Sequence, residues 1–177
     1  MPVGEDAWLF DLVAEDGQRR DAARARHRTL VDDARVEHSL YARIGDATFA
    51  TLFLAWEARY PEEWRDPGTW WGSPWTAKVG VLSRFGEAGV PPELDIELTE
   101  LVAAAVARRY RCKDWLYARV VRHLPGPLLD LALAPLADAP DPLTRLRVRF
   151  LLDVARDPER RVSRRTWGQW LGREPAA

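Results

Sequence analysis

The sequence is poor in the residues that build disulfide frameworks and metal sites. Among its 177 residues there are one cysteine and three histidines. A single cysteine, Cys112, excludes an internal disulfide framework and favours a reducing compartment, so we expect a cytoplasmic protein. The histidines are scattered along the chain and form no HExxH or similar ligand spacing. We therefore expect no bound metal and no other cofactor.

Long apolar runs are also missing. The only apolar run near the start, residues 8–14, follows two acidic residues and is interrupted by Asp11, unlike the core of a signal peptide. No segment approaches the roughly 20 apolar residues that a membrane-spanning helix needs. We expect a soluble protein without a membrane partner.

Charge is balanced overall but uneven along the chain. The formal net charge is −1, yet residues 1–100 are acidic and residues 101–177 are basic. This asymmetry fits a basic surface for an acidic partner, and equally two ends of one domain that attract each other on folding.

Hydrophobic periodicity predicts an all-α protein. Residues 47–56 carry no charge and repeat large apolar side chains at helical spacing, which indicates a buried central helix capped by Asp46. Ser73 and Pro74 predict the start of another helix, and Gly89 its end. No useful run alternates with period two, so we expect no sheet.

The C-terminal half should consist of short helices joined by turns of a few residues. Such turns make consecutive helices antiparallel neighbours. With 47% hydrophobic residues, the chain can fill one core, so we expect a single domain, residues 1–177, divided into N-terminal helices (1–90) and helical pairs (91–177). The expected C-terminal helices cover residues 92–110, 114–123, 127–137, 141–156 and 163–171.

A weak internal repeat runs through this half. An offset of 27 residues superposes Asp114 on Asp141 and Leu116 on Leu143. Self-similarity of this kind is typical of stacked helical units that bury their apolar faces against one another.

Residues 128–157 (LLDLALAPLADAPDPLTRLRVRFLLDVARD) resemble a HEAT repeat, with a leucine-rich helix, an Asp-bearing turn, an Asp-Pro step and a second helix. The resemblance implies a right-handed, α-solenoid-like helical stack whose curved face binds another macromolecule. It also implies that Asp138 and Arg145 belong to a ladder of ion pairs between neighbouring units.

A loop at residues 60–75 carries four tryptophans among three prolines and two glycines, which argue against a regular helix. Each tryptophan can bury roughly 150–250 Å². The cluster therefore either packs inward or forms an interface, and the sequence leaves both alternatives open. Its members are Trp64, Trp70, Trp71 and Trp75.

The sequence contains no nucleophile motif such as GxSxG and no phosphate-binding glycine loop. We therefore expect a non-catalytic protein that binds another protein in an adaptor, regulatory or immunity role. The alternative is nucleic-acid binding by the basic segment 156–173, of the kind seen in the DNA-alkylation-repair glycosylases, which resemble this architecture. Besides the four tryptophans, the candidate binding residues are Arg145, Arg149, Arg164, Arg165 and Trp167.

Overall fold

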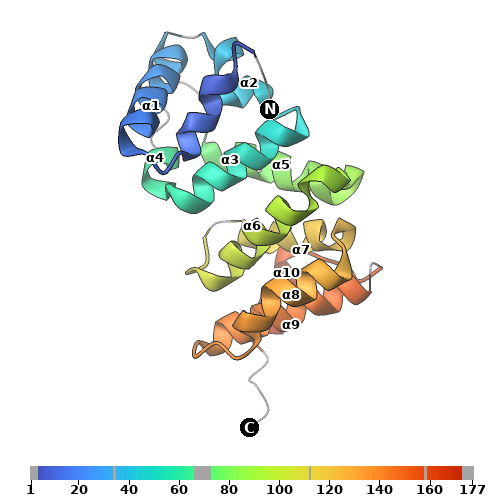
Figure 1. The fold of residues 1–177 in the computed structure, drawn as a ribbon. Coiled ribbons are helices and arrows are strands. Elements are labelled where there is room, and N and C mark those ends of the chain that lie inside the picture. Colours follow the sequence, from blue (N-terminus) through green and yellow to red (C-terminus); the bar gives the residue numbers. More distant parts are fainter. Residues whose placement is uncertain (1–3, 34, 66–72, 112, 158, 173–177) are drawn as a thin grey trace. The chain divides into compact units, whose positions relative to one another are not determined.

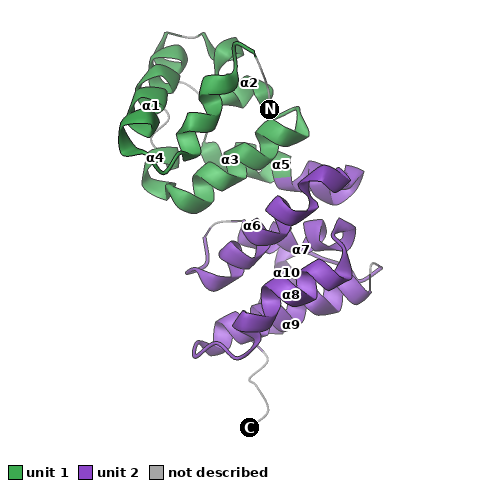
Figure 2. Cartoon of the chain, in the orientation of Figure 1, with its two compact units in different colours: residues 1–81 green, residues 82–177 purple. Residues whose placement is uncertain are grey.

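A computed structural model describes residues 4–33, 35–65, 73–111, 113–157 and 159–172. Within these ranges the chain forms helices and no strand, which confirms the prediction of an all-α protein. No helix in the same ranges combines the length and apolar character needed to span a bilayer. The chain divides into two compact units, residues 1–81 and 82–177, and the boundary lies inside helix α5 (Pro74–Ala88) (Figure 2).

Unit 1 is built around helix α3, whose sequence is almost free of charge. The Asp46 side chain accepts hydrogen bonds from the backbone N–H groups of Thr48 and Phe49, so the predicted cap of this helix is confirmed. Every residue from position 50 to 57 is buried, as expected for a central helix. The helices of unit 1 before α5 are η1 (Ala7–Val13), α1 (Gly17–Asp32), η2 (Val36–His38), α2 (Leu40–Arg43), α3 (Ala47–Arg59) and α4 (Pro61–Arg65), where η denotes a 3-10 helix (Figure 1).

The start of the tryptophan-rich segment is helical, whereas the sequence predicted an irregular loop. Residues 61–65 form the short helix α4. Pro61 occupies its first position, where a backbone N–H group would have no acceptor within the helix, so a proline costs no hydrogen bond. Residues 66–72, including Trp70 and Trp71, lie outside the described ranges.

Unit 2 follows the predicted order of helices closely. As predicted, Ser73 directly precedes α5 and Pro74 is its first residue, and Gly89, with a φ of 90°, follows its last residue in the left-handed conformation that favours glycine. After α5 come η3 (Pro92–Leu94), α6 (Asp95–Ala107), η4 (Asp114–Leu116), α7 (Tyr117–Val120), η5 (Val121–His123), α8 (Gly126–Ala137), α9 (Pro142–Arg156) and α10 (Arg164–Leu171).

Helix α9 is the centre of unit 2. It packs against α6, α7, α8 and α10, and its buried side chains include Val148, Phe150 and Leu151. The helix begins where the Asp-Pro step predicted, because the Asp141 carboxylate accepts hydrogen bonds from the N–H groups of Leu143 and Thr144. A further hydrogen bond from the Thr144 hydroxyl group is the main cause of a lowered pKa for Asp141.

The helix predicted over residues 114–123 is present with these bounds, but its hydrogen-bonding type changes along it, from 3-10 in η4 to α in α7 and back to 3-10 in η5. This region lies very close to the end of α5. A Cβ atom at Gly86 would come within 2.6 Å of the Arg119 Cβ atom, and His123 Nε2 lies 3.1 Å from the Gly86 carbonyl oxygen. The helical periodicity of this segment therefore predicted its bounds, but not its 3-10 turns or its close approach to α5.

Candidate functional site

The described tryptophans of the 60–75 segment belong mainly to the core of unit 1. Trp64 is fully buried, with its ring 5.4 Å from the Phe53 ring and 4.9 Å from the Trp75 ring. Trp75 is half-buried beside it. The interface alternative is therefore wrong for Trp64, because a side chain without exposed surface cannot contact a partner.

The tryptophans of α10 also point inward. Trp167 is buried, with its ring 5.1 Å from the Phe150 ring, and the Trp170 Nε1–H group donates a hydrogen bond to the Leu146 carbonyl oxygen. The sequence predicts Trp167 as a binding residue because aromatic rings beside arginines can stack on bases. Its burial corrects that prediction, and this ring instead joins α10 to α9.

Arg145 has a structural partner other than the one that the HEAT resemblance implied. Its guanidinium group donates hydrogen bonds to the carbonyl oxygens of Ala139 and Pro140, at 2.6 and 3.0 Å, and so holds the turn between α8 and α9. Neither Arg145 nor Asp138 has an ion pair in the described part of the chain, so the ladder contact is not formed by these two residues.

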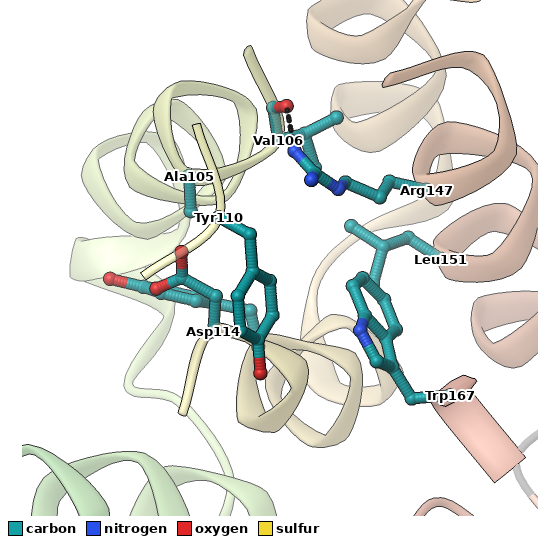
Figure 3. A pocket seen from close by; sticks show the side chains of 8 residues that line it. Ala105, Val106, Tyr110, Asp114, Arg147, Leu151 and Trp167 are labelled. Carbon is teal, nitrogen blue, oxygen red and sulfur yellow. Dashed lines mark hydrogen bonds between the residues drawn. The ribbon is translucent and has the colours of Figure 1, made fainter. Parts of the chain in front are cut away.

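A small cavity lies between α6, α7, α9 and α10 (Figure 3). Its volume is about 10 Å³, which is room for about one water molecule. The lining residues are Ala105, Val106, Tyr110, Asp114, Tyr117, Arg147, Leu151 and Trp167.

The charged groups of this cavity are occupied by the chain itself. The buried Arg147 guanidinium donates to the carbonyl oxygens of Val106, at 3.5 Å, and Arg108, at 3.0 Å, which end helix α6 (Figure 3). The Asp114 carboxylate accepts from the Arg111 N–H group and the Arg108 guanidinium. The bonds from Arg147 satisfy carbonyl groups at the end of α6 that would otherwise lack donors. The charged groups around the cavity therefore stabilise the packing of α9 against the end of α6. Sequence reasoning missed Arg147, since its partners lie about 40 residues earlier.

Unit 1 contains two buried polar groups that the sequence did not single out. Lys78 Nζ lies 3.4 Å from Glu57 Oε1, and both side chains are fully buried. His27 is 1% exposed, with ring centroids 5.6 Å from Tyr41 and 5.2 Å from Trp56. Burial lowers the pKa of His27 to about 4, so its ring is neutral at pH 7.

Neither group forms a recognisable catalytic arrangement. The His27 Nε2 and Trp56 Nε1 atoms are buried and have no hydrogen-bond partner within the described ranges. Over the same residues, no three His, Cys, Asp or Glu side chains come together as metal ligands. The polar chemistry of unit 1 is therefore that of a packed core.

Helix α8 carries Leu131, the most exposed large apolar side chain among the described residues. This helix is apolar apart from Asp130, yet only Leu129 and Leu133 are buried. Leu131 is 75% exposed, and the neighbouring stripe also includes Ala134 and Pro135. An apolar stripe that a protein leaves in water is a candidate contact surface.

Exposed arginines lie on α9, the helix that packs against α8. The two helices are antiparallel neighbours, because Arg145 bonds the turn at one end while Arg156 lies 3.4 Å from Asp130 at the other. Arg149 is exposed between these two contacts. We call this surface the α8–α9 face, made of Asp130, Leu131, Ala134, Pro135, Arg149 and Arg156.

The remaining predicted arginines extend the basic surface onto α10. Arg164 and Arg165 are exposed in its first turn, and Arg161 is exposed just before it. None of these three has an ion pair with a described residue. The Asp153 carboxylate lies 2.5 Å from the Arg160 guanidinium.

No protein-family model, curated protein or solved structure matches this chain. Its function is therefore inferred from the chemistry of its own residues.

Proposed function

We propose that this chain is a non-catalytic protein that binds another protein through the α8–α9 face of unit 2. One observation carries the proposal: α8 exposes Leu131 and its apolar neighbours to water, and α9, which packs against α8, exposes arginines. Protein interfaces combine apolar contact with arginine in this way. By contrast, the charged groups of the described cavity are engaged in structural hydrogen bonds.

The proposal includes a HEAT-like character for α8 and α9. Two antiparallel helices joined by a short turn, with Asp-Pro opening the second, support this assignment. In the same proposal, residues 91–177 form an α-solenoid-like stack, and the protein acts in the cytoplasm. A curved stack of helices offers a broad surface for a partner and needs no reactive group.

Nucleic-acid binding is the second candidate, and the exposed Arg161, Arg164 and Arg165 favour it. These side chains suit phosphate groups. However, Trp167 is buried and cannot stack on a base. The exposed arginines therefore support contact with phosphate groups, whereas Trp167 does not support stacking on bases.

A capture experiment tests the proposed function. The full chain and its double variant Leu131→Asp/Arg149→Glu would be used to capture proteins from the native host, with crosslinking and mass spectrometry. We expect a protein that the wild type recovers and the double variant does not. In parallel, a labelled DNA duplex would be titrated with the wild type at 50 mM salt. Recovery of the same proteins by both forms, or duplex binding that falls steeply with salt, would contradict the proposal.

A further inference from the structure

The α8–α9 face has the chemistry to recognise one kind of partner. Building on the proposed function, we infer that it receives an amphipathic, acidic helix of a partner protein. The partner's apolar residues lie against the exposed stripe of α8, and its carboxylates meet the arginines of α9. Helix recognition of this kind uses an apolar face with anchors three or four residues apart.

The geometry of the two helices supports this arrangement. Arg149 and Arg156 are seven residues apart on α9, which is two helical turns, so they lie on the same side of the helix. On α8, Leu131 and Pro135 are one turn apart and both exposed. The face thus offers a pair of arginines on α9 and a pair of exposed apolar side chains on α8. At 1.5 Å per residue, α9 is long enough for about three to four turns of a partner helix.

Charge complementarity selects an acidic partner. Arg149 is exposed and has no ion pair within the described ranges. Arg156 is paired with Asp130, but their side chains are 71% and 58% exposed, and surface pairs of this kind contribute little and are readily exchanged. The exposed arginines of α10 add to the positive potential.

The exposed apolar pair on α8 argues for a protein helix over a nucleic acid. A phosphate backbone gains nothing from contact with Leu131, whereas a leucine of a partner helix would bury it. Removing apolar surface from water contributes roughly 25 cal/mol for each Å². A partner that matches both pairs must therefore itself carry apolar and acidic side chains.

Selection from a peptide library tests this inference directly. The library would display helical 15-residue peptides of random charge to the full wild-type chain, and binders would be ranked by sequencing. We expect enrichment of Asp and Glu, together with Leu spaced three or four residues apart. A selected peptide made by synthesis should lose at least tenfold in affinity against Leu131→Asp and against Arg149→Glu, and should bind more weakly as salt rises.

An exposed arginine of unit 1 serves as the matched control. Arg24→Glu, in helix α1, makes the same charge change away from the proposed face. It should keep the affinity of the selected peptide within about threefold, and circular dichroism should show that all variants fold. Selected peptides that are basic, or that ignore both Leu131→Asp and Arg149→Glu, would overturn the inference. A host protein captured in a face-dependent way would then still support the proposed function.

Discussion

The buried histidine of unit 1 makes the stability of the protein depend on pH. Burial lowers the pKa of His27 from 6.5 to about 4, because the charged imidazolium loses its water inside the core. In the unfolded chain the ring binds a proton below pH 6.5, but in the folded chain it does so only near pH 4. Stability due to the neutral ring is therefore complete above pH 6.5 and is lost as the pH falls toward 4.

The size of the effect follows from this shift. The full difference corresponds to about 3 kcal/mol in the free energy of unfolding, and at pH 5.5 about 1 kcal/mol has been lost. Urea unfolding followed by circular dichroism between pH 8 and pH 4.5 measures it. His27→Phe replaces the imidazole with an apolar ring and should remove this part of the pH dependence.

The exposed His38 provides the control, because His38→Gln should leave the pH dependence unchanged. A nuclear magnetic resonance titration of the His27 ring protons reports the pKa itself. A value near 6.5, or equal pH dependence in wild type and His27→Phe, would refute the reasoning, since either result means that water reaches this ring.

Three further predictions concern packing and buried charge, and urea unfolding at pH 7 checks each of them. Gly86→Ala should lower the free energy of unfolding by roughly 1–3 kcal/mol because its Cβ has no room. Gly80→Ala, where an added Cβ would have nothing within 4 Å, should raise it by up to about 1 kcal/mol. Equal effects of the two substitutions would contradict the close contact at Gly86. Lys78→Met should lower the free energy of unfolding by about 3–5 kcal/mol, because it leaves the buried Glu57 without its countercharge. Adding Glu57→Leu to this variant should restore much of the lost stability. Arg147→Met should cost about 2 kcal/mol through the lost hydrogen bonds to the end of α6, and an unchanged midpoint would show that these bonds do not stabilise the fold.

The helix positions were readable from sequence wherever local chemistry sets them. Asp46 and Asp141 cap their helices through their own side chains, and Gly89 ends α5 because of its backbone conformation. These signals act within a few residues and need no knowledge of the rest of the fold. At residues 114–123 periodicity predicted the bounds of the helix, but not the change between 3-10 and α hydrogen bonding along it.

The candidate site was harder to predict from the sequence, because it depends on which side chains face the solvent. Arg149, Arg164 and Arg165 are exposed as the binding hypothesis requires, but Trp64 and Trp167 are buried. Composition places tryptophans and arginines in one segment without saying which of them faces water. The apolar stripe of α8 was also hidden, since a leucine-rich helix looks the same in sequence whether one side or all of it is covered.

The position of Arg147 has a consequence for how unit 2 is completed during synthesis. The carbonyl groups at the end of α6 can accept hydrogen bonds from Arg147 only after some 40 further residues have been synthesised and α9 has docked. A nascent chain that stops before position 147 would leave this helix end open to solvent and prone to fray. The last turn of α6 should therefore gain its protection late, and amide hydrogen exchange in this turn would report the docking of α9.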